Sequence, residues 1–266
     1  MRDTNAAVRL LAIDTATTLC GMTVLDLEPG TAGGDFGLGG GQGGIRAAVR
    51  RHGVSTHSEM LLPLIAEALD ELASSPRELS AVICGAGPGS FTGLRIGIAT
   101  AKGLCFALGV PLLMVSSLQA LGLAALQRSR AACPVLATLN AFRGQVFARL
   151  VLPADPTLLP PLQQLLAQHP ALLTDAVWEP AALGTLLAPV AAQLGLCGGG
   201  LVSYPVLRLA GAAVLDEDPS PHPLAVLQLG AARLRRGESD PLAAAAPNYI
   251  CASAAEENAA GRPGGS

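Results

Sequence analysis

Two short polar segments of this chain have residue types and spacing suited to chemistry at a phosphate group. Asp14 and Thr15 directly follow an apolar run, and the glycine-rich stretch 85–93 follows a second one, residues 79–84. A loop between a strand and a helix can point backbone N–H groups at an anion, and a nearby carboxylate can hold a cation that neutralises it. The candidates for binding a nucleotide or phosphate are Asp14, Thr15, Gly87, Gly89 and Ser90.

Neither segment completes a known catalytic motif. The glycine stretch contains no GxxxxGK[ST] and no complete GxGxxG sequence, and Ser90 lacks the flanking glycines of a nucleophile elbow. Asn140, at the end of a later apolar run, stands where a hard cation would need a second carboxylate. A phosphate-binding loop and a tight strand-to-helix turn therefore both fit the glycines, and Asp14 with its threonines could equally close a turn.

The histidines and cysteines form no metal site or activated nucleophile. His52 and His57 are five residues apart and Glu59 is two further on, a spacing that matches neither HExxH nor a helical HxxxH pair. The six cysteines contain no CxxC pair and are expected to be reduced, buried thiols. The sequence therefore assigns no catalytic residue and no metal ligand.

The elements that must position these residues begin with a hairpin and then alternate strands with helices. Thr56 and Glu59 have the spacing of a capping box at the start of the first helix, and Pro63 is expected to kink or set apart its first turn. The glycine-rich segment 28–44 predicts a flexible insert. The predicted strands are 10–14, 21–26, 45–50, 79–84 and 111–115, and the predicted helices are 56–72 and 93–108.

A second, similar set of elements is predicted from residue 119 onward. Residues 135–151 repeat the hairpin pattern of the first strands, with Asn140 in the place of Asp14. A strand is expected at 194–197 and a helix at 223–236. We therefore predict an α/β protein with the two-lobed actin, hexokinase and Hsp70-like (ASKHA) fold and a degenerate second lobe. The predicted division is a first lobe, 1–118, a second lobe, 119–255, and a disordered tail, 256–266.

Composition limits the classes of partner. A net charge of -3 with 14% charged residues gives no overall field to hold a polyanion, so any contact with nucleic acid is expected to be local or indirect. Hydrophobic residues make up 50% of the chain but are spread over its length. The first apolar run is too short for a signal peptide or a membrane span. A cytoplasmic protein without membrane contact is expected.

Three small residues, Gly93, Gly97 and Ala101, form a stripe along the second predicted helix at a spacing of four. Each interior glycine lowers the stability of a helix by about 1 kcal/mol relative to alanine. The close approach of another backbone is expected to offset this loss. An element of the same lobe and a second chain both fit this pattern.

Three segments carry a resemblance to a known family. Residues 11–17 read LAIDTAT, residues 57–63 read HSEMLLP, and residues 87–97 read GPGSFTGLRIG, which is the most specific of the three. Together they closely resemble the TsaB family, also called YeaZ. The likeness covers residues 8 to about 120 and continues thinly at 140–144 and 247–250. Family members usually carry Asp-Ala-Arg where this chain has Asn140-Ala141-Phe142, so the resemblance assigns no polar site between the lobes.

The resemblance implies a partner subunit needed to form N6-threonylcarbamoyladenosine beside the tRNA anticodon, with no complete reaction of its own. It implies pairing with the catalytic subunit TsaD and with the ATPase TsaE, contact with tRNA only through the complex, and ATP or ADP as a candidate ligand of that complex. In the family, the two first-lobe helices form the pairing surface. The candidate interface residues here are His57, Glu59, Leu61, Leu62, Gly93, Arg95, Gly97 and Ala101.

Two other functions fit parts of the sequence. A glycopeptidase- or nucleotide-hydrolase-like enzyme of the same fold would need a nucleophile with a base, or a paired metal site, and the sequence offers neither. A homodimeric binding module could self-pair through the same helices when the partner is absent.

Overall fold

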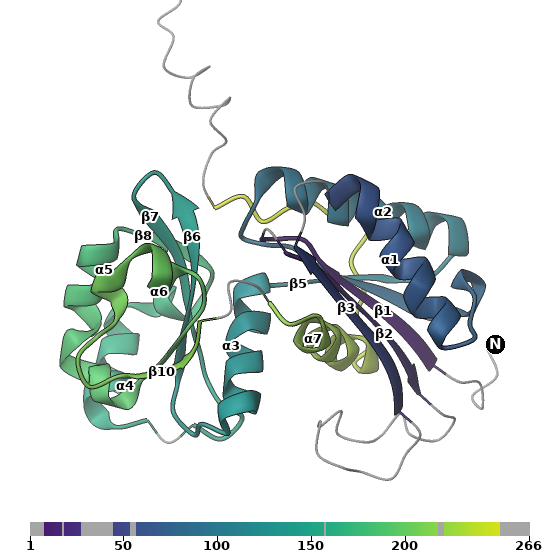
Figure 1. The fold of residues 1–266 in the computed structure, drawn as a ribbon. Coiled ribbons are helices and arrows are strands. Elements are labelled where there is room, and N and C mark those ends of the chain that lie inside the picture. Colours follow the sequence, from purple (N-terminus) through teal and green to yellow (C-terminus); the bar gives the residue numbers. More distant parts are fainter. Residues whose placement is uncertain are drawn as a thin grey trace, which may run out of the picture.

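The computed structural model describes residues 8–17, 19–27, 45–53, 57–156, 158–217 and 221–250. The predicted flexible insert, residues 28–44, and the predicted disordered tail, residues 256–266, lie outside these ranges. The described chain folds into two lobes, each built on a five-stranded sheet (Figure 1).

The first sheet has the strand order β3-β2-β1-β4-β5. β1 pairs antiparallel with β2, and β2 with β3, whereas β4 runs parallel to β1 and β5 parallel to β4. β1 is apolar on both faces, as a central strand covered on both sides must be: Leu11 and Ile13 enter one core, and Leu10 enters the other. The strands are β1 (Val8–Asp14), β2 (Leu19–Leu27), β3 (Ile45–Gly53), β4 (Ala81–Gly85) and β5 (Leu112–Val115).

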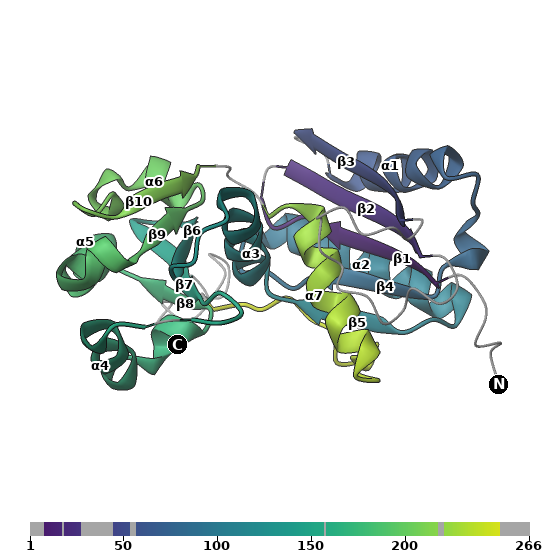
Figure 2. The same cartoon turned by 90° about the horizontal axis from the view of Figure 1, so that it is seen from below.

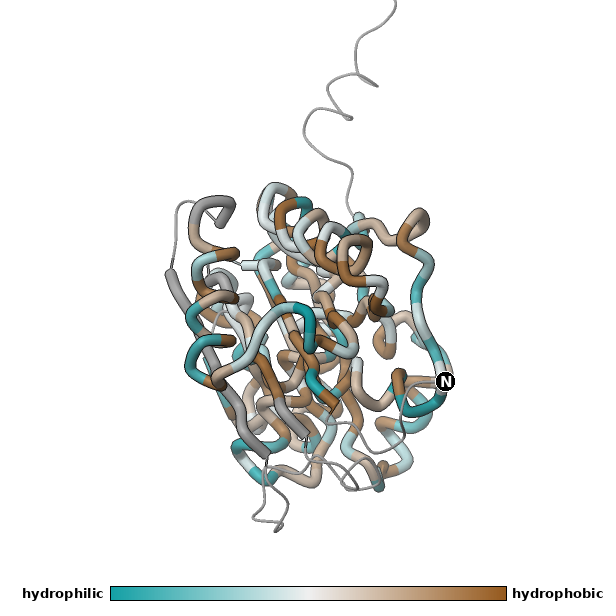
Figure 3. Tube along the Cα trace, turned by 90° about the vertical axis from the view of Figure 1, so that its right-hand side faces the viewer, coloured by the Kyte–Doolittle hydropathy of each residue, from teal (hydrophilic) through white to brown (hydrophobic). Residues whose placement is uncertain are grey.

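Helices cover both faces of this sheet (Figures 1 and 2). α1 (His57–Glu71) and α2 (Phe91–Leu108) lie on one face, with the short 3-10 turn η1 (Pro76–Glu78) after α1, and α7 (Pro223–Arg235) lies on the other. Hydrophobic residues run along the strands at the centre of the lobe (Figure 3). The predicted end of α2 is confirmed, because Gly109 adopts the left-handed conformation with φ of 66°.

α1 is a single helix that continues through Pro63, so its first turn is not set apart as expected. A proline removes one helical hydrogen bond, but burial of Leu61 and Leu64 in the first-lobe core holds the turns on either side of it. The predicted capping box cannot be compared, because Thr56 and the side chain of Glu59 lie outside the described part of the chain.

The second sheet repeats the first in shortened form. Its order is β10-β9-β6-β7-β8, so β6 takes the place of β1, with an antiparallel hairpin on one side and parallel strands on the other. Two lobes of the same strand order confirm the α/β actin- and hexokinase-like fold. The strands are β6 (Val135–Phe142), β7 (Gln145–Val151), β8 (Ala176–Trp178), β9 (Gly195–Cys197) and β10 (Ala213–Asp216). Its helices are α4 (Pro160–Gln168), α5 (Pro180–Leu187) and α6 (Gly200–Ser203), with 3-10 turns η2 (Pro170–Leu173), η3 (Ala188–Gln193) and η4 (Pro205–Leu207).

The chain returns to the first lobe after the second sheet, which corrects the predicted boundary that placed residues 119–255 together. Ala225, Val226 and Leu227 of α7 join the first-lobe core beside Leu10. Gly230 packs so closely on β4 that a Cβ there would lie 2.4 Å from a side-chain carbon of Ile83. A helix carries the same sequence pattern in either lobe, so its position depends on contacts that local periodicity does not record.

α3 (Ser117–Ser129) lies between the two lobes and packs against both. Ala120 and Ala124 enter the core under the first sheet, while Leu118 and Leu121 enter the core of β6 and β7. Because both sides of α3 are buried, the two lobes share this helix and are not connected by a free linker.

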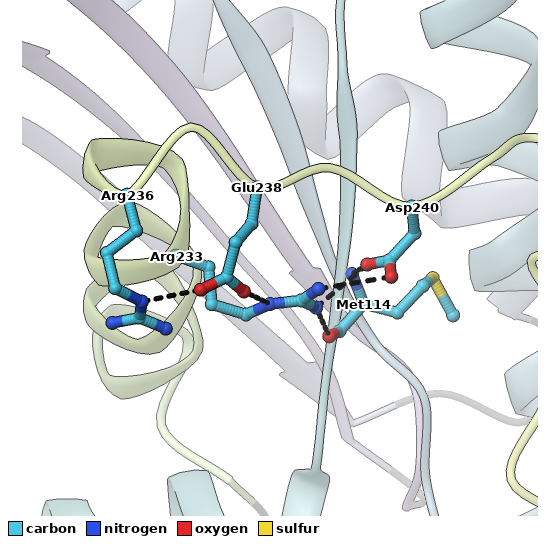
Figure 4. Close-up of polar contacts among 5 residues, drawn as sticks. All are labelled: Met114, Arg233, Arg236, Glu238 and Asp240. Carbon is cyan, nitrogen blue, oxygen red and sulfur yellow. Dashed lines mark hydrogen bonds and ion pairs between the residues drawn. The ribbon is translucent and has the colours of Figure 1, made fainter.

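The segment after α7 closes along the edge strand β5 (Figure 4). The amide of Asp240 donates to the carbonyl of Leu112 at 2.8 Å, and the Asp240 carboxylate accepts from the amide of Met114 at 2.7 Å. The Arg233 guanidinium binds both carboxylate oxygens of Asp240, at 2.8 and 3.1 Å, and donates to the Met114 carbonyl at 2.6 Å. The edge of the sheet is therefore covered by the chain itself.

One helix of the described chain, α2, is long and apolar enough by length and composition to span a membrane. In the fold, its buried face packs on the first sheet through residues that include Leu94, Ile98 and Cys105. This arrangement is that of a core helix.

Candidate functional site

Asp14 ends β1 as a carboxylate enclosed by the protein. Its oxygens accept hydrogen bonds from the Ser117 hydroxyl at 2.6 Å and from the amide of Ala16 at 2.9 Å. Burial raises the pKa of Asp14 from 3.8 to about 6, although both hydrogen bonds lower it. A Cβ on Gly85 would lie 2.0 Å from one of the carboxylate oxygens, so β4 also encloses the side chain. All the described contacts of the Asp14 carboxylate are therefore with groups of its own chain.

Thr15 explains why α2 begins with glycines. Its hydroxyl donates to the carbonyl of Gly93 at 2.8 Å. A Cβ on Gly93 would lie 2.2 Å from the Thr15 carbonyl oxygen, and one on Gly97 would lie 2.2 Å from the Thr15 hydroxyl. The small-residue stripe therefore packs inside the first lobe, against the end of β1.

The glycine loop between β4 and α2 is a tight turn held by internal hydrogen bonds. The amide of Gly87 donates to the Ser117 hydroxyl at 3.2 Å, and the amide of Ser90 donates to the carbonyl of Ala16 at 2.6 Å. The Ser90 hydroxyl caps α2 by accepting from the amide of Gly93 at 3.2 Å. A Cβ on Gly89 would lie 2.1 Å from the Ala16 carbonyl oxygen. The structure thus brings all five predicted phosphate-site residues together, but their hydrogen bonds go to neighbouring groups of the same lobe, namely those of Ala16, Gly93 and Ser117.

Asn140 has a local role of its own at the end of β6. Its side-chain oxygen accepts from the amide of Phe142 at 2.8 Å and from the Tyr204 hydroxyl at 3.1 Å. Asp14 and Asn140 occupy equivalent strand ends, yet each closes the turn of its own lobe. The sequence reasoning missed Tyr204 and Ser117; for Ser117, its place directly after a predicted strand was the available signal.

The described residues contain no group of three or more His, Cys, Asp and Glu side chains that could hold a metal ion. The side chains of His52 and His57 lie outside the description. Burial raises the pKa of Cys105 to about 11, and it raises the pKa values of Cys84 and Cys197 further. These three thiols stay protonated at neutral pH and are not nucleophiles.

The predicted interface residues separate into buried and exposed groups. Leu61 is buried, as are Gly93, Gly97 and Ala101, so they offer no free surface and their assignment to an interface is wrong. Leu62 is 55% exposed on α1, and Arg95 is exposed on α2. The side chains of His57 and Glu59 lie outside the description.

The outer face of α2 carries a different stripe, which we call the α2 ridge: Arg95, Ala99, Gly103 and Phe106. All four are exposed, at helical spacing, and Phe106 is 82% exposed. A Cβ on Gly103 would meet nothing within 4 Å. Because the buried glycines pack against Thr15, the face of α2 that is open to another chain is its exposed face, which includes the α2 ridge.

The family model of TsaD, tRNA N6-adenosine threonylcarbamoyltransferase, matches residues 49–153, the span from the end of β3 to just past β7. The tRNA threonylcarbamoyladenosine biosynthesis protein TsaB of Escherichia coli (strain K12) is 34% identical over 140 residues, 53% of this chain and 53% of the relative. The protein of that name in Bacillus subtilis (strain 168) is 35% identical over 94 residues, 35% of this chain and 40% of the relative. The match therefore spans about half the length of the E. coli relative.

A solved structure extends the likeness to nearly the whole molecule. YeaZ from Pseudomonas aeruginosa matches with a TM-score of 0.67 at 28% identity, over 91% of this chain and 99% of that one. The chain is similar to the TsaB/YeaZ proteins in sequence over about half of its length and in fold over nearly all of it. Two of its three TsaB/YeaZ-like segments, 11–17 and 87–97, are the ones that meet at Thr15, so the likeness includes the contact between β1 and α2.

Proposed function

We propose that this TsaB/YeaZ-like chain is a partner subunit in the formation of N6-threonylcarbamoyladenosine in tRNA, next to the anticodon, and that it completes no reaction alone. It pairs with a TsaD-type catalytic subunit and works with a TsaE-type ATPase, so that ATP or ADP is a ligand of the assembly and tRNA is reached through it. The chain acts in the cytoplasm. The names of the matched relatives support this pathway.

The enclosed state of Asp14 is the observation that carries the proposal. A carboxylate that serves a substrate must be within reach of it, whereas Asp14 is 2% exposed and its oxygens accept from Ser117 and Ala16. The neighbouring loop uses the amides of Gly87 and Ser90 in the same way. The residues that resemble a nucleotide site in sequence thus serve the internal packing of the first lobe.

The α2 ridge supports pairing with another chain. An exposed glycine in the interior of a helix costs about 1 kcal/mol relative to alanine, and Phe106 exposes an aromatic ring to water. Both costs are offset when a partner covers the helix and its backbone approaches Gly103 closely. We assign the pairing face to the α2 ridge with Leu62 of α1, in place of the buried stripe.

Reconstitution tests the proposal. The chain is purified with the TsaD-type and TsaE-type proteins of its own source, and the modified nucleoside is quantified after digestion of the tRNA, with each protein omitted in turn. Omission of this chain should reduce product to background, and the chain alone should hydrolyse no ATP. Full product without this chain contradicts the proposal. Size-exclusion chromatography with and without the TsaD-type protein distinguishes pairing from self-association.

A further inference from the structure

The last described residues cross from the first lobe to the second. Residues 245–250, here called the strap, follow the segment that covers β5 and run past the start of α2 toward β6 and β7 (Figures 1 and 2). None of their contacts is used by the site around Asp14.

The strap is attached to the first lobe at three places. The Lys102 side chain donates to the carbonyl of Ala245 at 3.1 Å, and the amide of Asn248 donates to the carbonyl of Ala86 at 2.7 Å. The Tyr249 ring stacks on Phe91, with centroids 5.1 Å apart. The Tyr249 hydroxyl accepts from Nε of Arg95 at 2.9 Å, and the Arg95 guanidinium lies 3.8 Å from the Phe91 ring centroid.

The same strap is attached to the second lobe. The Asn248 side chain donates to the Asp175 carboxylate at 3.2 Å, and Ile250 packs on the core of β6 and β7. The Asp175 carboxylate is 7% exposed and also accepts from Arg149 of β7 at 3.2 Å and from the hydroxyl of Ser116, the N-cap of α3, at 2.7 Å. Asp175 is therefore the point at which the strap and both lobes meet.

We propose that the strap holds the two lobes at a fixed angle, and that the hydrogen bond between Asn248 and Asp175 is the contact that attaches it to the second lobe. α3 is one connection between the lobes, and a single shared helix permits rotation about it. The strap adds a second connection, beside the N-terminal end of α3, and this connection restrains that rotation. The lobes of this chain then behave as one rigid body in solution, and release of the strap frees them to open.

The test uses the full-length chain and the double variant Asn248→Ala/Tyr249→Ala, which removes one side-chain attachment to each lobe. Val202→Ala is the matched control, because it removes a 62% exposed apolar side chain from α6 in the second lobe, outside the proposed pairing face. Two quantities are measured: hydrogen exchange of the amide at residue 248, and the radius of gyration by small-angle X-ray scattering. The double variant should exchange at least about tenfold faster at that amide and should have a larger radius of gyration, and the control should match the unchanged chain in both.

Two results would overturn the proposal. Exchange in the double variant within about twofold of the unchanged chain would show that these side chains do not hold the strap. A freed amide with an unchanged radius of gyration would show that the strap does not fix the angle between the lobes. If the double variant does not fold, Asn248→Ala alone, which leaves the Tyr249 stack in place, is judged by the same two criteria.

Discussion

At the scale of single residues, Asp14 is a carboxyl group that is buried away from water, and this burial raises its pKa. Its folded-state pKa, about 6, lies above the value of 3.8 expected in the unfolded chain. The folded state therefore binds the proton more tightly. The contribution of Asp14 to the free energy of unfolding is greatest below about pH 4 and is lost as the pH rises through about 6.

Asp14→Asn should remove this dependence. Asparagine keeps an acceptor for the amide of Ala16 but carries no charge, so the free energy of unfolding should change less between pH 4 and 7 than in the unchanged chain. The difference should be on the order of 2–3 kcal/mol. Urea unfolding at several pH values measures it. Asp70→Asn, at an exposed position on α1, is the control, and equal pH slopes in all three proteins would contradict the prediction.

The sequence located the residues of this site but not their partners. Asp14, Thr15 and the glycine loop were identified from motifs, and the structure brings them together. The contact between Asp14 and Ser117 joins residues 103 positions apart, and no local pattern encodes a contact of that separation. The contacts of the loop with Ser117 and Ala16 have the same long-range character, so the sequence left phosphate binding and a tight turn both open.

At the scale of elements, the two glycines of α2 that differ in burial should respond in opposite ways to the same change. Gly97→Leu places a side chain where Thr15 already lies, so it should lower the free energy of unfolding by about 3 kcal/mol or more. Gly103→Leu extends into open space and improves helix propensity, so it should raise that energy by up to about 1 kcal/mol.

Binding to the TsaD-type subunit provides a second test of the exposed position, Gly103. Gly103→Leu should abolish binding to the TsaD-type subunit in calorimetry while its thermal melt stays as high as that of the unchanged chain, because the added bulk lies on the α2 ridge. Gly103→Ala, with only a methyl group, is the graded control. A fully binding Gly103→Leu variant would place the pairing face elsewhere.

Arg233 should contribute more to the free energy of unfolding than the other arginines at the end of α7. It binds Asp240 through two nitrogens and donates to the Met114 carbonyl, so Arg233→Ala removes the guanidinium from both groups and leaves the Asp240 carboxylate with the Met114 amide. The variant should lose about 1–3 kcal/mol in denaturant unfolding. Arg236→Ala removes a side chain that is 60% exposed and paired with Glu238, and should cost less than about 1 kcal/mol. Equal losses would show that the β5 edge is not held by Arg233.

Elements that bury only one face were predicted from the sequence, whereas an element that is buried on both sides was not. Both hairpins, α1, α2 and α7 were predicted, because each has one apolar face or a clear alternation. α3 was missed: it is buried against both lobes, so its apolar residues surround the helix and leave no single stripe. The position of α7 was wrong because its amphipathic pattern fits any sheet face.

At the scale of the whole molecule, the segment between β2 and β3 should be replaceable. Leu27 pairs with Ile45, so the strand ends on either side of residues 28–44 are already opposite each other. Replacing those residues by Asn-Gly, which favours a two-residue hairpin turn, should leave the melting temperature and partner binding nearly unchanged. Thermal unfolding and calorimetry measure both. A large loss of either would show that the segment contributes contacts to the fold or to the complex.

The return of α7 to the first lobe sets an order of events during synthesis on the ribosome. The first sheet is complete in sequence once β5 has emerged, but the face that carries Leu10 and Ile83 receives α7 only after the whole second lobe has been translated. A nascent chain that ends before residue 223 therefore presents an uncovered apolar sheet face to the cell for the time needed to add roughly a hundred residues, several seconds at about 5–20 residues per second. We therefore expect the nascent first lobe to bind chaperones during that interval, and we expect a chain that stops within the second lobe to leave this face of the first lobe uncovered.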